Sequence, residues 1–324
     1  MITSVLLFAV GLVLLIKGGD WFVDGATGIA KRFNLPDIVV GATVVSIGTT
    51  LPEVMVSTTG ALAGSGAMAY GNAIGSIICN TALIAAISIT CNPGPVNVKS
   101  MKTPAIFFFC SAALYCLAAY GLGTFPRWMG FVMLTIFVIY MVLTVRNGLQ
   151  NPDSAEEEEE EESKPKALWQ ELLLLVIGAA VIAVGADLLV DHGQIIAIGL
   201  GVPETVVALL FVALGTSLPE LVTTITSLKK GRASLGVGNV IGANVFNLVL
   251  VSGVAVSLAP FDVPVENELL NTGLNLSLVF DIPVMLLVMS LMIFPTLANK
   301  KLGRWQGITL LCIYAAFCVC QFVL

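Results

Sequence analysis

Long apolar stretches, separated by short polar joints, run along the chain from its first residues to its last. A helix needs about 20 largely apolar residues to cross a bilayer. Stretches of that length recur, and the joints between them carry proline, glycine, asparagine or basic residues. The pattern predicts an all-α polytopic membrane protein with ten transmembrane helices, over 2–23, 37–62, 68–90, 102–122, 127–146, 168–190, 204–228, 235–259, 279–298 and 303–323.

The composition supports a lipid environment. Of the 324 residues, 57% are hydrophobic and 11% are charged, against about 45–50% and about 25% in soluble domains. An ordinary cytosolic enzyme is excluded, because a single protein core cannot hide that much apolar surface. The chain has a single histidine, His192, and its seven cysteines form no CxxC pair, so a zinc or redox centre is not expected. No phosphate-binding loop points to ATP-driven transport, and we expect no cofactor and no nucleic-acid partner.

The net charge of −6 has a local origin. Asp153 and the run Glu156–Glu162 supply eight of the 21 acidic residues. Because like charges repel and extend a chain, residues 148–167 are expected to form an acidic linker, too short for a folded regulatory domain.

Cytoplasmic loops of membrane proteins are enriched in lysine and arginine. If the N-terminus is placed outside, 14 of the 15 basic residues become cytoplasmic and only Arg127 lies outside. We therefore expect a multi-pass protein of a cell inner or plasma membrane, with the N- and C-termini outside and the acidic linker in the cytoplasm.

The sequence repeats itself at a fixed offset of 167 residues. Gly48–Glu53 reads GTTLPE and Gly215–Glu220 reads GTSLPE. The same offset pairs further residues without a gap: Asp20 with Asp187, Asp24 with Asp191, Pro36 with Pro203, Asn72 with Asn239, and Asn80 with Asn247.

Each copy holds five predicted spans, an odd number, so the two halves are expected to insert with opposite orientation, as in many secondary transporters. The expected units are a first five-helix repeat at 1–147 with its motif at 41–81, the linker at 148–167, and a second repeat at 168–324 with its motif at 208–248.

Glu53 and Glu220 lie near the middle of their predicted spans. An ionisable side chain there costs roughly 2.5–3.5 kcal/mol, and the few lysines and arginines within the predicted spans, such as Lys17, lie toward span ends rather than beside the glutamates at the midplane. The preceding Gly-Thr-Thr/Ser-Leu-Pro run is expected to break each helix at the midplane and to turn carbonyls inward, because proline has no N–H to donate.

Oxygen atoms suited to a cation accompany the two glutamates. Hydroxyl groups of the GT[ST]LPE motifs lie beside the carboxylates, and a Gly/Asn-rich stretch follows each motif, at Gly71–Asn80 and Gly238–Asn247. Such a stretch alone is more often a packing surface. Beside a broken helix with a central glutamate, its amide oxygens become candidate ligands, since carboxylate, carbonyl and hydroxyl oxygens suit Ca²⁺ and Na⁺.

At these motifs the chain resembles the Ca²⁺:cation antiporter superfamily, in particular the prokaryotic type of sodium/calcium exchanger. The resemblance covers essentially the whole chain. It implies a secondary antiporter that exchanges Ca²⁺ for Na⁺ by alternating access, with helices 2, 3, 7 and 8 as the core and helices 1 and 6 sliding as a gate. By motif match it implies the metal ligands Glu53, Glu220, Thr49, Thr50, Thr216, Ser217, Asn80, Asn247 and Ser76.

Two positions depart from the resemblance: Asn247, where relatives often carry aspartate, and Ala243, where they often carry serine. The two glutamates then give the site a charge of at most −2, and the counter-ion stays open between Na⁺, H⁺ and K⁺. A cation channel is a further alternative, and an intramembrane enzyme with Glu53 and Glu220 as acid and base is disfavoured, because those roles need different surroundings. The expected partners are Ca²⁺, monovalent cations and the lipid bilayer, and a monomer is plausible.

Other acidic residues are given structural roles. Asp20 with Asp24, and Asp187 with Asp191, stand four residues apart near span ends, where interfacial anchoring or capping is the simpler interpretation than a metal site. Asp281, before Pro283, is expected to be a helix N-cap.

Overall fold

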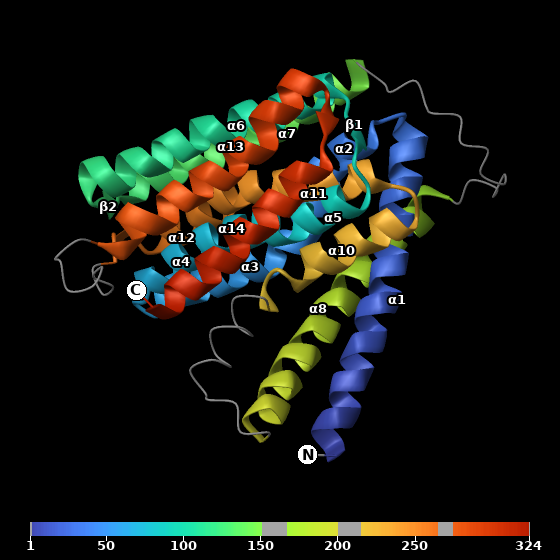
Figure 1. Ribbon diagram of the computed structural model, residues 1–324, viewed down its shortest axis with the longest axis horizontal. Coiled ribbons are helices and arrows are strands. Elements are labelled where there is room, and N and C mark those ends of the chain that lie inside the picture. The colour runs from blue at the N-terminus through green and yellow to red at the C-terminus, as the bar shows by residue number, and fades with distance from the viewer. Residues whose placement is uncertain (1, 151–166, 200–214, 265–274, 324) are drawn as a thin grey trace.

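The computed structural model describes residues 2–150, 167–199, 215–264 and 275–323. They form a bundle of long helices (Figure 1). Several of these helices contain a π-helical stretch, which is given the label η in the text. The helical elements are α1 (Ile2–Phe33), α2 (Asp37–Val40), η1 (Gly41–Val45), α3 (Ser46–Leu62), α4 (Gly66–Cys79), η2 (Asn80–Ala85), α5 (Ala86–Cys91), α6 (Val98–Cys116), η3 (Leu117–Leu122), α7 (Arg127–Gln150), α8 (Leu168–Gly199), α10 (Leu218–Lys229), α11 (Ala233–Phe246), η4 (Asn247–Val251), α12 (Ser252–Leu258), η6 (Ser277–Asp281), α13 (Ile282–Asn299) and α14 (Arg304–Val323).

Eight helices of the described residues are long and apolar enough to cross a membrane. They coincide with eight of the ten predicted spans. A ninth prediction, 303–323, corresponds to the 20-residue helix α14. The remaining one, 204–228, lies partly outside the described residues, and α10 covers its end. Most of the acidic linker, Pro203 and part of the connection between 258 and 280 also lie outside them.

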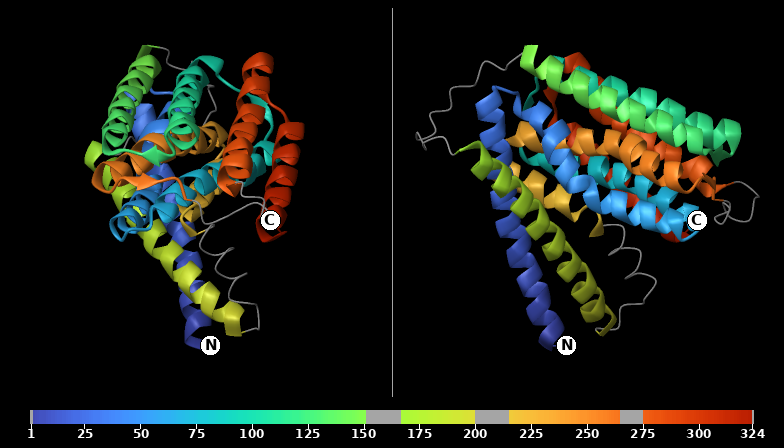
Figure 2. Two further views of the ribbon diagram at one scale, coloured as in Figure 1. Left: turned by 90° about the vertical axis from the view of Figure 1, so that its left-hand side faces the viewer. Right: turned by 180° about the vertical axis from the view of Figure 1, so that it is seen from behind.

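Two helices are longer than predicted, and they pack against each other. α1 extends to Phe33 and α8 to Gly199, each 32 residues long. They run antiparallel and meet closely at glycines, since a Cβ atom at Gly11 would lie 2.9 Å from the Gly185 carbonyl oxygen. The pair leans away from the remaining helices (Figure 2).

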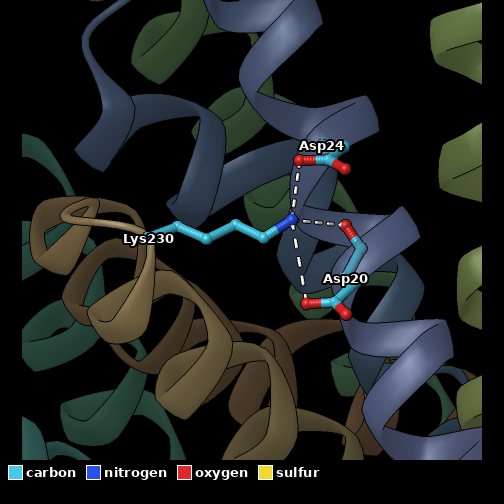
Figure 3. A network of polar contacts seen from close by, with 3 residues as sticks. All are labelled: Asp20, Asp24 and Lys230. Carbon is cyan, nitrogen blue, oxygen red and sulfur yellow. Dashed lines mark hydrogen bonds and ion pairs between the residues drawn. The ribbon is translucent and has the colours of Figure 1, made fainter. Parts of the chain in front are cut away.

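Ion pairs tie the α1 helix to its neighbours at one end. The Lys230 Nζ, just after α10, lies 2.7 Å from Asp24 and 3.8 Å from Asp20 and also donates a hydrogen bond to the Asp20 carbonyl (Figure 3). Arg32 near the end of α1 pairs with Glu171 at the start of α8 at 2.9 Å. The interfacial anchoring expected of Asp20 and Asp24 thus has a named partner.

Two short antiparallel sheets lie at opposite ends of the bundle (Figure 1). In one, β1 (Gly94–Pro95) pairs with β4 (Lys301–Leu302); in the other, β2 (Thr124–Phe125) pairs with β3 (Phe261–Asp262). Each sheet therefore joins a strand from before the acidic run to a strand from after it. β1 and β3 are also separated by the offset of 167 residues.

Asp281 is not the N-cap that the sequence suggested. Asn275 takes this role, because its side-chain oxygen accepts hydrogen bonds from the backbone N–H groups of Ser277 and Leu278. Asp281 lies one turn further, inside the helix, and its carboxylate accepts a hydrogen bond from Gln321 of α14 at 2.6 Å. The helical segment already includes η6, which precedes Pro283, so the helix begins earlier in the chain than the proline had indicated.

Candidate functional site

The residues of the two GT[ST]LPE motifs lie on α3 and at the start of α10. Thr49, Thr50 and Glu53 are on α3, where each is at most 1% exposed. Ser217 directly precedes α10 and Glu220 lies in its first turn, at 1% and 0% exposure. α3 and α10, which carry Glu53 and Glu220, contact each other. The two motifs are therefore brought together.

The helix geometry around the motifs differs between the two copies. α10 begins at Leu218 after a turn at Thr216 and Ser217, with Pro219 in its first turn. α3 instead continues through Pro52, and the irregular stretch lies before it, in η1. Proline lacks an N–H, so Pro52 still cannot donate a hydrogen bond to the Gly48 carbonyl.

The second part of each motif supplies a π-helical segment. η2 begins at Asn80 and η4 begins at Asn247, two residues that the offset of 167 relates. Both side chains are completely buried, and Ser76 on α4 is 3% exposed. α3 contacts α4 and η4, while α10 contacts α11 and η2, so elements from both parts of the chain surround the glutamates.

Six of these buried side chains have polar atoms without a hydrogen-bond partner in the part of the chain that the structure describes. They form three pairs related by the offset, namely Thr50 with Ser217, Glu53 with Glu220, and Asn80 with Asn247. Leaving a buried polar group unsatisfied costs about 1–3 kcal/mol, more if it is charged. None of the ion pairs among the described residues involves either glutamate. Buried polar groups without a partner call for an explanation in a folded protein, and a bound ion is one that suits this set of oxygens.

The remaining predicted ligands, Thr49 and Thr216, donate hydrogen bonds. The Thr49 hydroxyl donates to the Asn239 side-chain oxygen at 3.1 Å, and the half-buried Thr216 donates to that of Asn72 at 3.4 Å. Asn72 and Asn239 are themselves related by the offset. All nine predicted site residues thus lie on α3 or α10, on elements that contact α3 or α10, or in the turn directly before α10.

Sequence reasoning missed the roles of these two asparagines. Asn72 donates to Ser57 at 2.8 Å and to the Glu53 carbonyl at 3.3 Å, while Asn239 accepts from Ser46. Their equivalence under the repeat was visible, but a Gly-Asn pair in a small-residue stretch is the usual sign of close packing. That packing is also present, since a Cβ atom on Gly238 would collide with the Ile38 carbonyl.

Comparison with known proteins decides the family. A model of the sodium/calcium exchanger protein family matches residues 3–146 and 171–323. The chain belongs to the sodium/calcium exchanger family. It is therefore a membrane transporter and not an enzyme, and members of this family carry Ca²⁺ and Na⁺ as transported ions rather than as cofactors.

Individual exchangers and related membrane proteins agree over nearly the full length. An uncharacterized membrane protein of Methanocaldococcus jannaschii is 35% identical over 95% of this chain and 94% of its own. The sodium/calcium exchanger MaX1 of Methanosarcina acetivorans is 29% identical over 98% of both chains. A structure of the sodium–calcium exchanger NCX_Mj, soaked with 2.5 mM Na⁺ and 0.1 mM Ca²⁺, matches with a TM-score of 0.78 and 32% identity, over 98% of this chain and 97% of that one.

Proposed function

We propose that this chain is a secondary antiporter that exchanges Ca²⁺ for Na⁺ across the membrane by alternating access. The observation that carries the proposal is the set of buried, unpartnered oxygen groups that the repeat relates in pairs, with Glu53 and Glu220 at its centre. Two carboxylates neutralise one Ca²⁺, and the amide and hydroxyl oxygens complete a hard-ligand shell. The same oxygens accept Na⁺ when Ca²⁺ leaves, so occupancy by either ion offsets the buried charge.

The proposed ligands are the nine residues that the sequence pointed to. Glu53 and Glu220 provide the charge, and neutral oxygens come from the remaining seven: Thr49, Thr50, Ser76, Asn80, Thr216, Ser217 and Asn247. We assign the two halves of the repeat, 1–147 and 168–324, to opposite orientations in the membrane. The termini then lie outside and the linker 148–167 lies in the cytoplasm. The pairing of β1 with β4 and of β3 with β2 supports this symmetry.

The leaning pair of α1 and α8 is the proposed moving element. In each half, the first helix leans away from the bundle along part of its length (Figure 2), while the rest of it packs on elements that carry the ligands, α1 against α10, and α8 against α3 and α10. Sliding of this pair across the site opens it to one side and closes it to the other, while the glutamates stay in place. Glycine contacts between α1 and α8 support motion as one unit, because the two backbones pack directly on each other.

The test uses purified protein in proteoliposomes loaded with Ca²⁺, with Na⁺, K⁺ and pH gradients imposed one at a time. We expect Na⁺ on the opposite side to release Ca²⁺, and Glu53→Gln or Glu220→Gln to abolish release. Asp262→Asn is the matched control, because Asp262 is an exposed carboxylate on β3. Release that follows only the pH or K⁺ gradient would establish the H⁺- or K⁺-coupled alternative, and release without any counter-ion would indicate a channel.

A further inference from the structure

Two hydrogen bonds link the halves of the chain in the same way. The Thr49 hydroxyl of the first half donates to Asn239 of the second, and the Thr216 hydroxyl of the second half donates to Asn72 of the first. The offset of 167 residues relates the two threonines and also the two asparagines. Because the same hydrogen bond occurs at both positions that the repeat relates, we take it to be a feature of the site and not an accidental contact.

The direction of these bonds determines what the threonines offer. A hydroxyl group has one proton and two lone pairs. Because each threonine donates its proton to an amide oxygen, both lone pairs stay available to a cation. The amide comes from the other half of the chain, whereas Thr43 donates to the Val39 carbonyl of its own helical segment, four residues earlier. The orientation of the Thr49 and Thr216 hydroxyls is therefore set across the site.

Each asparagine is held so that its oxygen faces the threonine. The Asn72 amide nitrogen donates to Ser57 and to the Glu53 carbonyl, which leaves its oxygen for Thr216. The Asn239 side-chain oxygen accepts from both Thr49 and Ser46. For Asn72 the contacts at both ends of the amide fix which end is the acceptor, whereas for Asn239 the two hydroxyl donors point to the oxygen and the amide nitrogen has no partner among the described residues.

We propose that Asn72 and Asn239 are positioning residues that hold the Thr216 and Thr49 hydroxyls with their lone pairs toward the transported cation. The inference rests on the proposed function, because it assigns the two threonines to that cation site. The asparagines bind no ion themselves. They act through the threonines, so their effect on ion affinity disappears when the threonine hydroxyl is absent.

A double-mutant cycle tests this dependence. Thr49→Val, Asn239→Leu and the double variant are compared in Na⁺-driven Ca²⁺ release, with the half-saturating Na⁺ concentration and the maximal rate measured separately. We expect each single variant to raise the half-saturating Na⁺ concentration about tenfold, the effect of one mis-set or missing ligand. We expect the double variant to stay within about twofold of the single ones. Thr216→Val with Asn72→Leu forms the second cycle.

Matched variants keep the result interpretable. Thr103→Val removes a threonine that accepts a hydrogen bond from an asparagine, Asn147, on the exposed surface, and it should leave both parameters unchanged. If Asn239→Leu does not fold, Asn239→Ala enters the same cycle. Direct binding of radioactive Ca²⁺ to the detergent-purified variants gives a readout that does not require transport, and it should show the same non-additive pattern.

The proposed function and the positioning role fail in different ways. Wild-type protein that shows no Na⁺-dependent Ca²⁺ release overturns the proposed function, and the Ca²⁺-binding cycle then still tests the positioning role. Wild-type protein that exchanges the ions, with variants whose effects multiply in the cycle, overturns only the positioning role, because Asn239 would then act independently of Thr49.

Discussion

Asn80 and Asn247 each begin a π-helical segment, and both side-chain amides are completely buried without a partner among the described residues. π-helical turns often mark functional sites, since the wider turn shifts the following side chains. Here the same irregularity occurs at two positions that the repeat makes equivalent. Asn247 is also one of the two positions at which the resemblance noted from the sequence is incomplete, so under the proposed function we expect it to be a sensitive point for ion coupling.

Replacing Asn247 by aspartate should strengthen Na⁺ binding. The change makes the proposed site more negative, from −2 to −3. Two unit charges 4 Å apart interact by about 1 kcal/mol in bulk water and about 4 kcal/mol near a protein surface. We expect Asn247→Asp to lower the half-saturating Na⁺ concentration about tenfold, equal to ~1.4 kcal/mol. Flux assays in proteoliposomes measure this shift.

The equivalent change, Asn80→Asp, should act in the same direction, whereas Asn247→Leu should weaken Na⁺ binding. Asn147→Asp introduces a carboxylate on the exposed surface and serves as the control. An unchanged Na⁺ dependence in Asn247→Asp, in protein that still transports Ca²⁺, would place Asn247 outside the cation site.

The Arg32–Glu171 pair should contribute strongly to the stability of the α1–α8 contact. Glu171 is 4% exposed, and removing one partner of a buried ion pair costs roughly 3–5 kcal/mol. Because Arg32 is one-third exposed, we expect Arg32→Met to lower the free energy of unfolding by about 3 kcal/mol, the lower end of that range. Thermal unfolding in detergent measures it.

Removing the charge of Glu171 as well should recover most of the free energy of unfolding that Arg32→Met loses. In the double variant Arg32→Met with Glu171→Gln, no unpaired charge is left in the interface, so its melting temperature should lie well above that of Arg32→Met. If the double variant loses as much stability as Arg32→Met and Glu171→Gln together, Arg32 and Glu171 do not stabilise the fold as a pair.

The Lys230 contacts should influence conformation more than stability. Lys230 and its two aspartates are each more than a quarter exposed, and exposed pairs contribute only about 0–1 kcal/mol. The contacts of Lys230 with Asp20 and Asp24 nevertheless connect α1 to the segment after α10. The repeat has no equivalent contact for α8, because the position equivalent to Lys230 is Ala63, which carries no charge. If the chain works by the proposed alternating access, removing Lys230 should shift the balance between the inward-open and outward-open states.

We expect Lys230→Met to change the ratio of the half-saturating Na⁺ concentrations on the two sides of the membrane by up to about fivefold, the equivalent of ~1 kcal/mol. The control is Lys229→Met, because Lys229 takes part in none of the ion pairs of the described residues. Equal ratios in wild type, Lys230→Met and Lys229→Met would show that the tie does not bias the two states.

The sequence revealed the candidate site better than it revealed the shape of the helices. Hydropathy and the 167-residue offset predicted the helical class and singled out Glu53 and Glu220, because charge is rare in apolar spans and its recurrence is easy to detect. The end of α1 was missed, since Asp20 and Asp24 resemble a span end until Lys230 is seen beside them. The irregular turns were also predicted at the wrong residues. They lie in η1 and η6, before Pro52 and Pro283, and not at the prolines themselves.

Gly238 allows α11 to cross η1 and its neighbour α2, and this crossing should not tolerate a side chain. A Cβ atom there would lie 2.8 Å from the Ile38 Cα and would collide with its carbonyl oxygen, and backbone atoms cannot move aside as a flexible side chain can. We expect Gly238→Ala to cost about 1–3 kcal/mol of stability and to displace Asn239 from Thr49, which lowers the apparent Na⁺ affinity as well.

Gly94→Ala is the control, because a Cβ atom at Gly94 would point into open space. Melting curves and Na⁺-driven flux measured on the same samples test both effects, and a Gly238→Ala protein with wild-type values in both would contradict the close crossing of α11 over α2 and η1.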